Sequence, residues 1–350
     1  MKILYGIQGT GNGHISRAIE IIPHLQKWGD VDILISGQHC EIDLPYEVKY
    51  RFKGLGFIFG TNGGIDFMST YLKNKIRRFY KEIKNLPVEK YDIVITDFEP
   101  VTAWACFFKN KPCIGLSNQI SVLAENAPQP KKVDPIGKFV LKNYCPITDG
   151  YGFHFKRYNK NIYTPILRKE VRNLKITDEG FYLVYLPAYE EEKIIKSLSK
   201  YPDVKWKVFS KHSKRTFTEK NVEINPINKE LFMESLASCT GVLCNAGFAA
   251  TSEALYLKKK LMVIPMKNQF EQQCNAEALG EMGVPVLKSL KFKHHEKMEK
   301  WISESTIIDV DFPDETEKLI DTIIEKHVVS KMIKELTAET VFSKSLYPVF

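Results

Sequence analysis

Residues 241–275 run GVLC-NAGFAATSEAL-YLKKK-LMVIP-MKNQF-EQQCN. A short apolar run, Gly241–Cys244, leads into a loop of small residues that opens a helical pattern at Asn245–Leu255. A second apolar run, Leu261–Pro265, is followed by a polar loop and a further helix start at Glu271. Strands and helices that alternate in this way are typical of a parallel β-sheet covered by helices on both faces. The stretch therefore predicts part of a doubly wound α/β domain.

The same alternation fills most of the chain. Short β-branched runs predict two sets of strands, at 2–7, 31–36, 47–52, 92–96 and 113–116, and at 181–187, 205–209, 222–224, 242–244 and 261–265. A chain of 350 residues is long enough for two α/β domains. We predict a first Rossmann-like domain over 1–160, a second over 161–330, and a tail over 331–350 that could return to the first.

A glycine-rich loop separates the first predicted strand from the first helix. It comprises Gly9-Thr10-Gly11-Asn12-Gly13-His14. Free backbone N–H groups and the helix dipole make such a place attractive to anionic or strongly polar ligands. A dinucleotide-binding loop requires glycine where His14 stands and an acidic residue after the second strand, where the sequence has Ser36-Gly37-Gln38. An NAD site is therefore disfavoured.

His14 is a candidate catalytic base. It begins a helix at the carboxyl edge of the predicted sheet, where open α/β folds bind ligands, and imidazole accepts a proton near neutral pH. Asp97 ends the strand 92–96 on the same edge and could hold the tautomer of His14, with Glu99 in reserve. Two alternatives remain: His14 forms only local hydrogen bonds, or Asp97 caps the following helix.

The small residues Asn245, Ala246 and Gly247 form a second helix start suited to a pyrophosphate. Asn245 and Thr251 could add side-chain donors to it. Glu253 lies further along the helix, where its carboxylate could accept hydrogen bonds from the vicinal hydroxyls of a ribose. These residues predict a nucleotide-binding loop.

Glu271, Gln272 and Asn275 stand at the head of the next predicted helix. A carboxylate and carboxamides suit a neutral polyol because each can take hydrogen bonds from sugar hydroxyls. Taken singly, such residues are also ordinary helix caps. Their joint spacing nevertheless predicts contacts to a donor sugar.

At these residues the chain resembles the GT-B glycosyltransferases related to the UDP-glycosyltransferases, the peptidoglycan transferase MurG and monogalactosyldiacylglycerol synthase. Gly11, Gly13 and His14 match the family's Gly-Gly-His or Gly-His loop, whose histidine activates the acceptor in many members. A closer likeness is to poorly characterised archaeal and bacterial transferases that share the Thr-Asp-Phe-Glu-Pro of 96–100 and the Asn-Gln of 118–119. The resemblance implies two Rossmann-like domains that face each other across a cleft.

The donor segment carries the rest of the resemblance. Residues 245–247 match the His/Asn-Gly-Gly diphosphate loop, and 251–255 match a Thr-x-x-Glu-Ala-Leu motif whose glutamate binds ribose. Residues 271–275 match the Asp/Glu-Gln-x-x-Asn motif that binds the donor sugar. Two positions depart from the commoner pattern: Asn245 replaces histidine and Glu271 replaces aspartate.

The resemblance implies an inverting hexosyltransferase that uses a nucleoside-diphosphate sugar, with UDP as the expected nucleotide. Retaining relatives carry a second glutamate eight residues before the ribose-binding one, and that place is Asn245 here. No metal or other cofactor is expected, and Asp309-Val310-Asp311 is interpreted as a solvated loop. The alternatives are an epimerase or hydrolase acting on sugar nucleotides, and a protein that binds sugar nucleotides without catalysis.

Composition bears on partners and location. The net charge of +8 favours anionic partners, but no nucleic-acid-binding motif accompanies it. Seven cysteines without a Cys-x-x-Cys pair predict reduced, buried thiols. No apolar run approaches the roughly 20 residues that span a bilayer, and the N-terminus lacks a signal-peptide pattern. We expect a cytoplasmic protein that could also bind peripherally at the inner face of the membrane.

The acceptor, a small molecule, glycan or lipid, is expected to contact the first domain, at residues 54–66 and 121–138. A basic amphipathic helix over 72–86 could rest on an anionic membrane and present a lipid acceptor. The alternative is that this helix packs on its own sheet and exposes its basic face to solvent.

Overall fold

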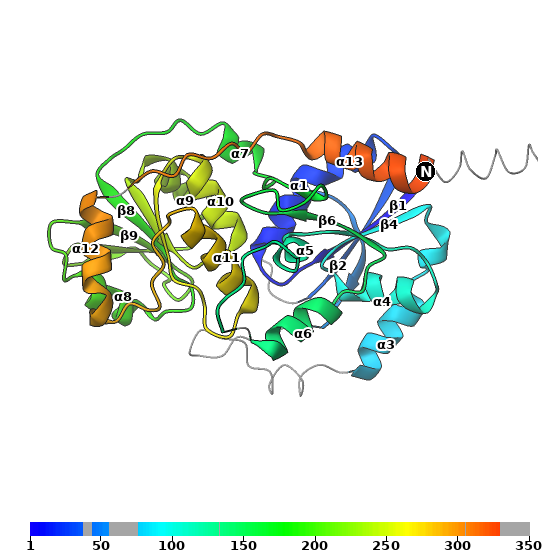
Figure 1. Cartoon of the computed structure of the whole chain (residues 1–350), viewed down its shortest axis with the longest axis horizontal. Helices are drawn as coiled ribbons and strands as arrows, with labels where there is room; N and C mark the ends of the chain where they lie inside the picture. Colours follow the sequence, from blue (N-terminus) through cyan, green and yellow to red (C-terminus); the bar gives the residue numbers. More distant parts are fainter. Residues whose placement is uncertain (38–43, 56–75, 133, 305, 330–350) are drawn as a thin grey trace, which may run out of the picture.

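The computed structural model describes residues 1–37, 44–55, 76–132, 134–304 and 306–329. Within these ranges the chain forms two lobes side by side, each built on a mainly parallel β-sheet with helices packed against it (Figure 1). Helices of the second lobe face helices of the first across the junction between the lobes (Figure 1).

The first lobe holds a parallel sheet with strand order β3-β2-β1-β4-β5-β6-β7. Its described strands are β1 (Lys2–Gln8), β2 (Asp30–Ser36), β3 (Val48–Phe52), β4 (Ile93–Asp97), β5 (Ile114–Leu116), β6 (Asp149–Phe153) and β7 (Ile162–Tyr163). The winding direction reverses at β1, which pairs with both β2 and β4. Ligands of open α/β sheets bind at such a switch point, beyond the carboxyl ends of the strands.

The helices of the first lobe follow these strands in turn. They are α1 (Asn12–Gln26), α3 (Ile76–Asn85), the 3₁₀ turn η1 (Val88–Lys90), α4 (Pro100–Phe108), α5 (Asn118–Val122) and α6 (Pro135–Asn143). Pro23 stands in the last turn of α1, which ends at Gln26.

The second lobe repeats the architecture with strand order β10-β11-β9-β8-β12-β13, parallel except for β10. Its strands are β8 (Phe181–Tyr185), β9 (Lys205–Ser210), β10 (Phe217–Glu219), β11 (Val222–Pro226), β12 (Gly241–Cys244) and β13 (Lys260–Val263). Its helical segments are α8 (Glu191–Leu198), α9 (Lys229–Ser238), α10 (Phe248–Tyr256), α11 (Phe270–Glu281), η2 (Phe292–His294) and α12 (His295–Glu304). Here the winding reverses at β8, between β9 and β12.

The predicted strands all form, each within two residues of its expected bounds. Strands β6, β7 and β10 were not predicted. The sequence of β6 is DGYGF, and its two glycines weaken the strand pattern. Strand β7 spans only two residues, too few to give a strand pattern.

The chain passes between the lobes at α7 (Lys169–Arg172) and again before α13 (Thr316–Ile324). The two passages touch where Arg172 donates to the carbonyl of Phe312 at 2.8 Å. Helix α13 then packs along α1 (Figure 1), and Trp28 donates to Asp321 at 2.8 Å. The π-helical turn η3 (Glu325–Val329) follows. The predicted second domain, 161–330, thus includes a helix that lies on the first lobe, while the predicted tail, 331–350, lies outside the described residues.

One cluster of buried apolar residues continues from the first sheet into the second. At the junction the rings of Phe155 and Phe248 lie 5.2 Å apart between centroids, although they belong to different lobes. Separate clusters cover the outer face of each sheet. The two lobes therefore share part of one core.

Candidate active site

His14 and Asp97 come together at the switch point of the first sheet, as the sequence predicted. His14 lies in the first turn of α1, and its Nδ1 is 2.8 Å from Oδ1 of Asp97 at the end of β4. Asp97 is fully buried. The reserve candidate, Glu99, instead caps α4 by accepting from the backbone N–H groups of Val101 and Thr102 at 2.7 and 2.6 Å. The alternative that Asp97 caps this helix is therefore wrong.

Arg17 completes this cluster and was not singled out from the sequence. Its guanidinium binds both oxygens of Asp97, with Nε to Oδ2 at 2.9 Å and a terminal nitrogen to Oδ1 at 2.6 Å. The signal was available, because His14 and Arg17 are three residues apart on a helix and so share a face. What the spacing does not reveal is that this face meets β4.

The surroundings of Asp97 keep its carboxyl ionised. Burial opposes ionisation, but the charge of Arg17 and the contact with His14 outweigh it and hold the pKa of Asp97 below its ordinary value. A carboxylate accepts hydrogen bonds only, so the bond between Nδ1 of His14 and Asp97 requires the proton on Nδ1. The terminal nitrogen of Arg17 that lies 3.1 Å from the same Nδ1 then donates to Asp97 instead. The other ring nitrogen, Nε2, is then the one able to accept a proton.

The second lobe offers an open helix N-terminus at its own switch point. Strand β12 ends at Cys244, and α10 begins at Phe248 after the loop of Asn245, Ala246 and Gly247. No described atom lies within 4 Å of the place a Cβ would take on Gly247, so this end of α10 has free space before it. Backbone N–H groups in such a place attract an anion.

Gly11 and Gly13 shape the opposite side. Gly11 precedes α1 with φ of 92°, a backbone conformation that favours glycine. A Cβ on Gly13 would lie 3.9 Å from the Cβ of Ala249 in α10. The beginnings of α1 and α10 therefore face each other across the two lobes, which brings the predicted base and the predicted diphosphate loop to one place.

Three predicted donor contacts are placed differently from expectation. Thr251 is fully buried, and its hydroxyl donates to the carbonyl of Gly247 at 2.8 Å. The amide nitrogen of Asn245 donates to the carbonyl of Ile264 at 2.7 Å. Asn275 is also fully buried and donates to Ala246 at 3.0 Å. Thr251 and Asn275 thus bond to backbone carbonyls of the loop itself, and Asn245 bonds to the backbone just after β13. All three side chains hold the loop in place.

Glu253 is paired with an arginine that the sequence analysis did not single out. Nε and a terminal nitrogen of Arg168 donate to the two carboxylate oxygens at 2.7 Å each, and both side chains are largely buried. Arg168 immediately precedes α7, in the first passage between the lobes. A carboxylate oxygen has more than one lone pair, so Glu253 can still accept from a ribose. The two hydrogen bonds from Arg168 fix the orientation of this carboxylate, and so the direction from which a ribose hydroxyl can donate to it.

Glu271 and Gln272 open α11, as expected. Glu271 accepts hydrogen bonds from Asn118 and Gln119 of the first lobe, at 2.8 and 2.9 Å. The side-chain oxygen of Gln272 accepts from the backbone of Met266 at 3.0 Å. Both residues remain partly exposed, unlike Asn275.

A cavity of about 160 Å³ opens in the first lobe next to this cluster. Thr96 and Phe98, which flank Asp97, form one wall, and Gln119 forms part of another. The remaining lining is mainly apolar and includes Ile120, Leu123, Leu141 and Ile147. The cavity therefore offers an apolar compartment at the end of β4, lined by the two sequence neighbours of Asp97.

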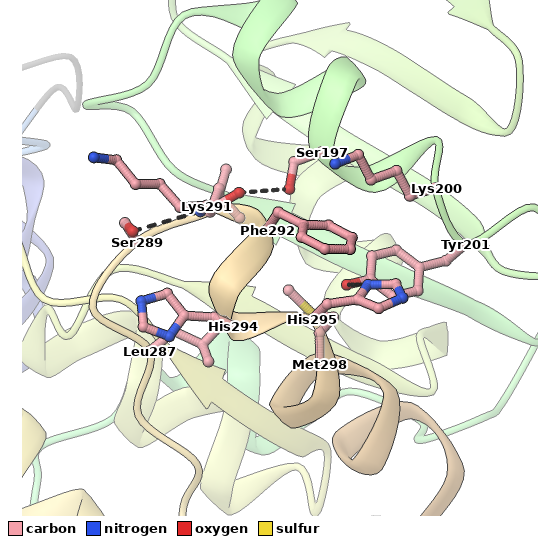
Figure 2. Close-up of a pocket in the computed structure, with 11 residues that line it drawn as sticks. Ser197, Lys200, Tyr201, Leu287, Ser289, Lys291, Phe292, His294, His295 and Met298 are labelled. Atoms are coloured by element: carbon pink, nitrogen blue, oxygen red, sulfur yellow. Dashed lines mark hydrogen bonds between the residues drawn. The ribbon is translucent and has the colours of Figure 1, made fainter.

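A second, much smaller cavity lies at the outer end of the second lobe (Figure 2). Its volume of about 10 Å³ holds no more than one water molecule. Phe292 stacks on His295, whose ring nitrogen is 2.7 Å from the hydroxyl of Tyr201. These contacts hold η2 and α12 against the second sheet. Within the described ranges, no group of three His, Cys, Asp or Glu side chains is arranged to hold a metal ion.

Comparisons with known proteins give one family match and several structural likenesses. A model described as glycosyl transferase family 1 matches residues 1–304. The fold is similar to the glycotransferase of kitacinnamycin, with 12% identity, a TM-score of 0.57, and coverage of 95% of this chain and 98% of that one. It is also similar to UGT2 of Phytolacca americana, with 12% identity, a TM-score of 0.56, and 95% and 98% coverage.

MurG of Acinetobacter baumannii shows the same likeness, with 13% identity, a TM-score of 0.53, and coverage of 93% of this chain and 99% of that one. At such identities the structural likeness shows the fold alone. No curated protein sequence matches the chain. The family match, together with two facing Rossmann-like lobes, gives the conclusion: the chain belongs to glycosyl transferase family 1 and is a glycosyltransferase of the GT-B fold.

Proposed function

We propose that this enzyme transfers a sugar from a nucleoside-diphosphate sugar, specifically a UDP-sugar, to an acceptor hydroxyl with inversion at the anomeric carbon. One observation carries the proposal: the His14–Asp97 pair and the open N-terminus of α10 face each other, with Gly13 near Ala249. A base and a site for a leaving diphosphate thus stand on opposite sides of one cleft. The similar Phytolacca structure is described as a complex with UDP-2-fluoroglucose and pterostilbene, a donor analogue and an acceptor.

In the proposed reaction, the acceptor oxygen attacks the anomeric carbon while Nε2 of His14 takes its proton. The bond between that carbon and the diphosphate oxygen breaks, and UDP leaves with the electron pair. Backbone N–H groups at the start of α10 stabilise the charge on the departing diphosphate, which removes the need for a metal ion. Asp97 stabilises the imidazolium that forms on His14.

Inversion is supported by the residue that occupies the position eight before Glu253. Asn245 stands there, and its side-chain nitrogen is engaged by the carbonyl of Ile264. A carboxamide held in this way is neither a nucleophile nor a carboxylate that could stabilise charge on the sugar. The simpler mechanism is a single displacement by the activated acceptor, which inverts the anomeric carbon.

The apolar cavity beside Asp97 is the proposed place for the acceptor. Leu123 lies in the stretch 121–138 that was expected to contact it, whereas Ile120, Leu141 and Ile147 are additional. The other expected acceptor segment, 54–66, is mostly outside the described residues. We infer an acceptor with an apolar portion that enters the cavity while its hydroxyl remains beside His14.

The roles of His14 and Glu253 can be separated by experiment. His14→Ala should lower kcat for UDP release from the correct UDP-sugar by about 10²- to 10⁴-fold, because the general base is lost, while UDP affinity changes little. Glu253→Ala should weaken UDP binding because a ribose contact is lost. Thermal shift with a panel of nucleoside diphosphates and their sugars measures binding, since a ligand of the folded state raises its melting temperature.

Lys300→Ala is a suitable control, because Lys300 is exposed on α12, at the outer end of the second lobe (Figure 1). If no nucleotide shifts the melting temperature of the wild type, the donor assignment is wrong. Release of UDP or an isomerised sugar without any acceptor would favour the hydrolase or epimerase. Binding without turnover, unchanged in His14→Ala, would favour a non-catalytic role.

We also propose that the first lobe rests on an anionic membrane at its inner face. Three aromatic side chains and one isoleucine form an exposed apolar patch, which consists of Ile76, Tyr80, Phe107 and Phe108. Each of these side chains is 56–60% exposed. The rings of Tyr80 and Phe108 lie 6.4 Å apart, so α3 and α4 both contribute. Exposed basic side chains surround the patch on α3, namely Arg77, Lys81 and Lys84. Apolar groups ringed by positive charge suit an interface with anionic lipid.

The basic helix predicted over 72–86 is described from Ile76 onward, and part of it packs inward. Ile83 and Leu86 are buried. Within the described residues, no helix is long and apolar enough to cross a membrane. Any membrane contact of this part of the chain would therefore be peripheral.

Replacing Phe107 and Phe108 with serine should reduce co-sedimentation with phosphatidylglycerol vesicles several-fold, and added salt should reduce binding by the wild type. Phe292→Ser is a matched control, because Phe292 is 67% exposed on the other lobe. An equal loss with Phe292→Ser, or equal binding to neutral phosphatidylcholine, would contradict the proposal.

A further inference from the structure

Asn118 connects functional groups of the two lobes. It is the first residue of α5 and is 4% exposed. Its side-chain oxygen accepts from Arg17 at 3.2 Å, and its side-chain nitrogen donates to Oε1 of Glu271 at 2.8 Å. Because Arg17 also binds Asp97, a continuous run of hydrogen bonds joins Asp97 in the first lobe to Glu271 in the second.

Gln119 provides a second arm of the same bridge. Its side-chain nitrogen donates to Oε2 of Glu271 at 2.9 Å, so both oxygens of this carboxylate are held from the first lobe. Around the bridge, Val122 of α5 packs with Phe270 and Cys274 of α11 in a small apolar cluster. This packing limits the access of water to the bridge, which strengthens its hydrogen bonds.

Electrostatics leaves the amide of Asn118 only one orientation. If the amide were flipped, its oxygen would face the carboxylate of Glu271 and its nitrogen would face the guanidinium of Arg17. Both arrangements are repulsive, since a carboxylate only accepts and a guanidinium only donates. Asn118 therefore needs an acceptor oxygen toward Arg17 and a donor nitrogen toward Glu271. Neither aspartate nor alanine can make both hydrogen bonds.

We propose that Asn118 is a positioning residue that sets Glu271 for the donor sugar only when the lobes are together, and links it through Arg17 to the His14–Asp97 pair. The inference rests on the function proposed above. Without the bridge, Glu271 is free to turn away from the sugar while the nucleotide remains bound at α10. Asn118 therefore acts on the sugar and on turnover, and the nucleotide alone does not depend on it.

Asn118→Asp tests this with little change of shape. The new carboxylate still accepts from Arg17 but repels Glu271 across the cleft. A charge-assisted hydrogen bond is lost, so kcat and the affinity for the UDP-sugar should fall about 10- to 100-fold, whereas UDP affinity should stay within about twofold. Asn161→Ala is the control, because Asn161 is an amide of the first lobe that lies outside both expected acceptor segments and donates to the carbonyl of Gly150 at 3.3 Å.

A second substitution provides a rescue. In Asn118→Asp with Glu271→Gln, the glutamine amide can donate to the new carboxylate, so the bridge is restored with reversed polarity. Glu271→Gln should therefore raise kcat in the Asn118→Asp background, by at least about threefold, although it removes a carboxylate from the sugar site. If Asn118 only stabilised the fold, Glu271→Gln would not raise kcat in the Asn118→Asp variant.

A double-mutant cycle on the unfolding free energy tests the bridge without any substrate, since contacting residues show non-additive effects. Additive effects of Asn118→Asp and Glu271→Gln on stability would overturn the bridge itself. Equal loss of UDP and UDP-sugar affinity, or wild-type turnover in Asn118→Asp, would overturn its role in positioning. If the cycle shows coupling but the wild type uses no UDP-sugar, the bridge stands and the proposed function fails.

Discussion

At the scale of single residues, the cleft depends on buried charges that neutralise one another. Arg17 faces Asp97, and Arg168 faces Glu253, each pair joined by two hydrogen bonds. Removing one member of such a pair leaves a buried charge without a partner, which is far more costly than the pair itself is favourable. Both pairs hold a carboxylate that is assigned a role toward the substrate, so their geometry is set before substrate arrives.

His154 gives a prediction at the same scale. It is 1% exposed, and its Nδ1 accepts from the backbone N–H of Phe155 at 2.9 Å. Burial lowers its pKa to about 4 from 6.5. The unfolded chain then takes up the proton first as pH falls, so stability present above pH 6.5 is lost on the way to pH 4, by about 3 kcal/mol.

Urea unfolding at several pH values between 7 and 4 measures this loss. In His154→Asn the amide oxygen can still accept from Phe155, but the titrating ring is gone, so the slope over this interval should flatten. The exposed His212, changed to asparagine, serves as control and should keep the wild-type slope. An unchanged slope in His154→Asn would refute the assignment.

At the scale of elements, capping decides which helix ends are open to a ligand. Helices α1 and α10 begin without a side-chain cap and without an acidic residue in the first turn, as does the five-residue α5. Helix α4 begins on the same edge of the first sheet, but Glu99 occupies its N–H groups. An anion is therefore attracted to the two helix ends that face the cleft and excluded from the third.

Helix α13 gives a prediction at this scale, because it covers the outer side of α1. Ile320 and Ile323 are fully buried there. Ile320→Ala should lower the unfolding free energy by about 2–5 kcal/mol, since it leaves a cavity against α1. Lys318→Ala, on the exposed face of the same helix, should change it by no more than about 0.5 kcal/mol. Chemical denaturation measures both, and similar effects of the two changes would show that α13 is not docked.

At the scale of the whole molecule, the shared core couples the lobes. The cluster that includes Phe155 and Phe248 continues through both sheets. Domains with separate cores tend to unfold separately, whereas a continuous core favours a single cooperative transition. The two lobes are therefore joined through this core, where Phe155 meets Phe248.

Calorimetry tests this coupling. The wild type should unfold in one transition, with equal calorimetric and van't Hoff enthalpies. Phe248→Ala should lower stability by about 3–5 kcal/mol and should separate the transitions of the two lobes, because it removes the ring that faces Phe155. Phe292→Ala, at an exposed phenylalanine, should do neither. Two transitions in the wild type would contradict the continuity of the core.

The sequence by itself determined the two doubly wound sheets, the two glycine-containing loops and the meeting of His14 with Asp97. These features follow from local patterns: alternation of strands and helices sets a parallel sheet, and the carboxyl ends of parallel strands share one edge. Glu253 and Glu271 were also singled out from the sequence, as candidate contacts to a ribose and to a donor sugar. Each belongs to a motif with fixed spacing at the start of a helix.

Only the tertiary structure decided which partner each of these side chains has. Arg17 meets Asp97 across 80 residues, and Asn118 meets Glu271 across 153. It also showed that Asn275 and Thr251 are buried and donate to backbone carbonyls of the donor loop. Periodicity tells which face of an element a residue occupies, but a hydrogen bond requires atoms within about 3 Å. That distance depends on how separate elements pack, which local sequence does not encode.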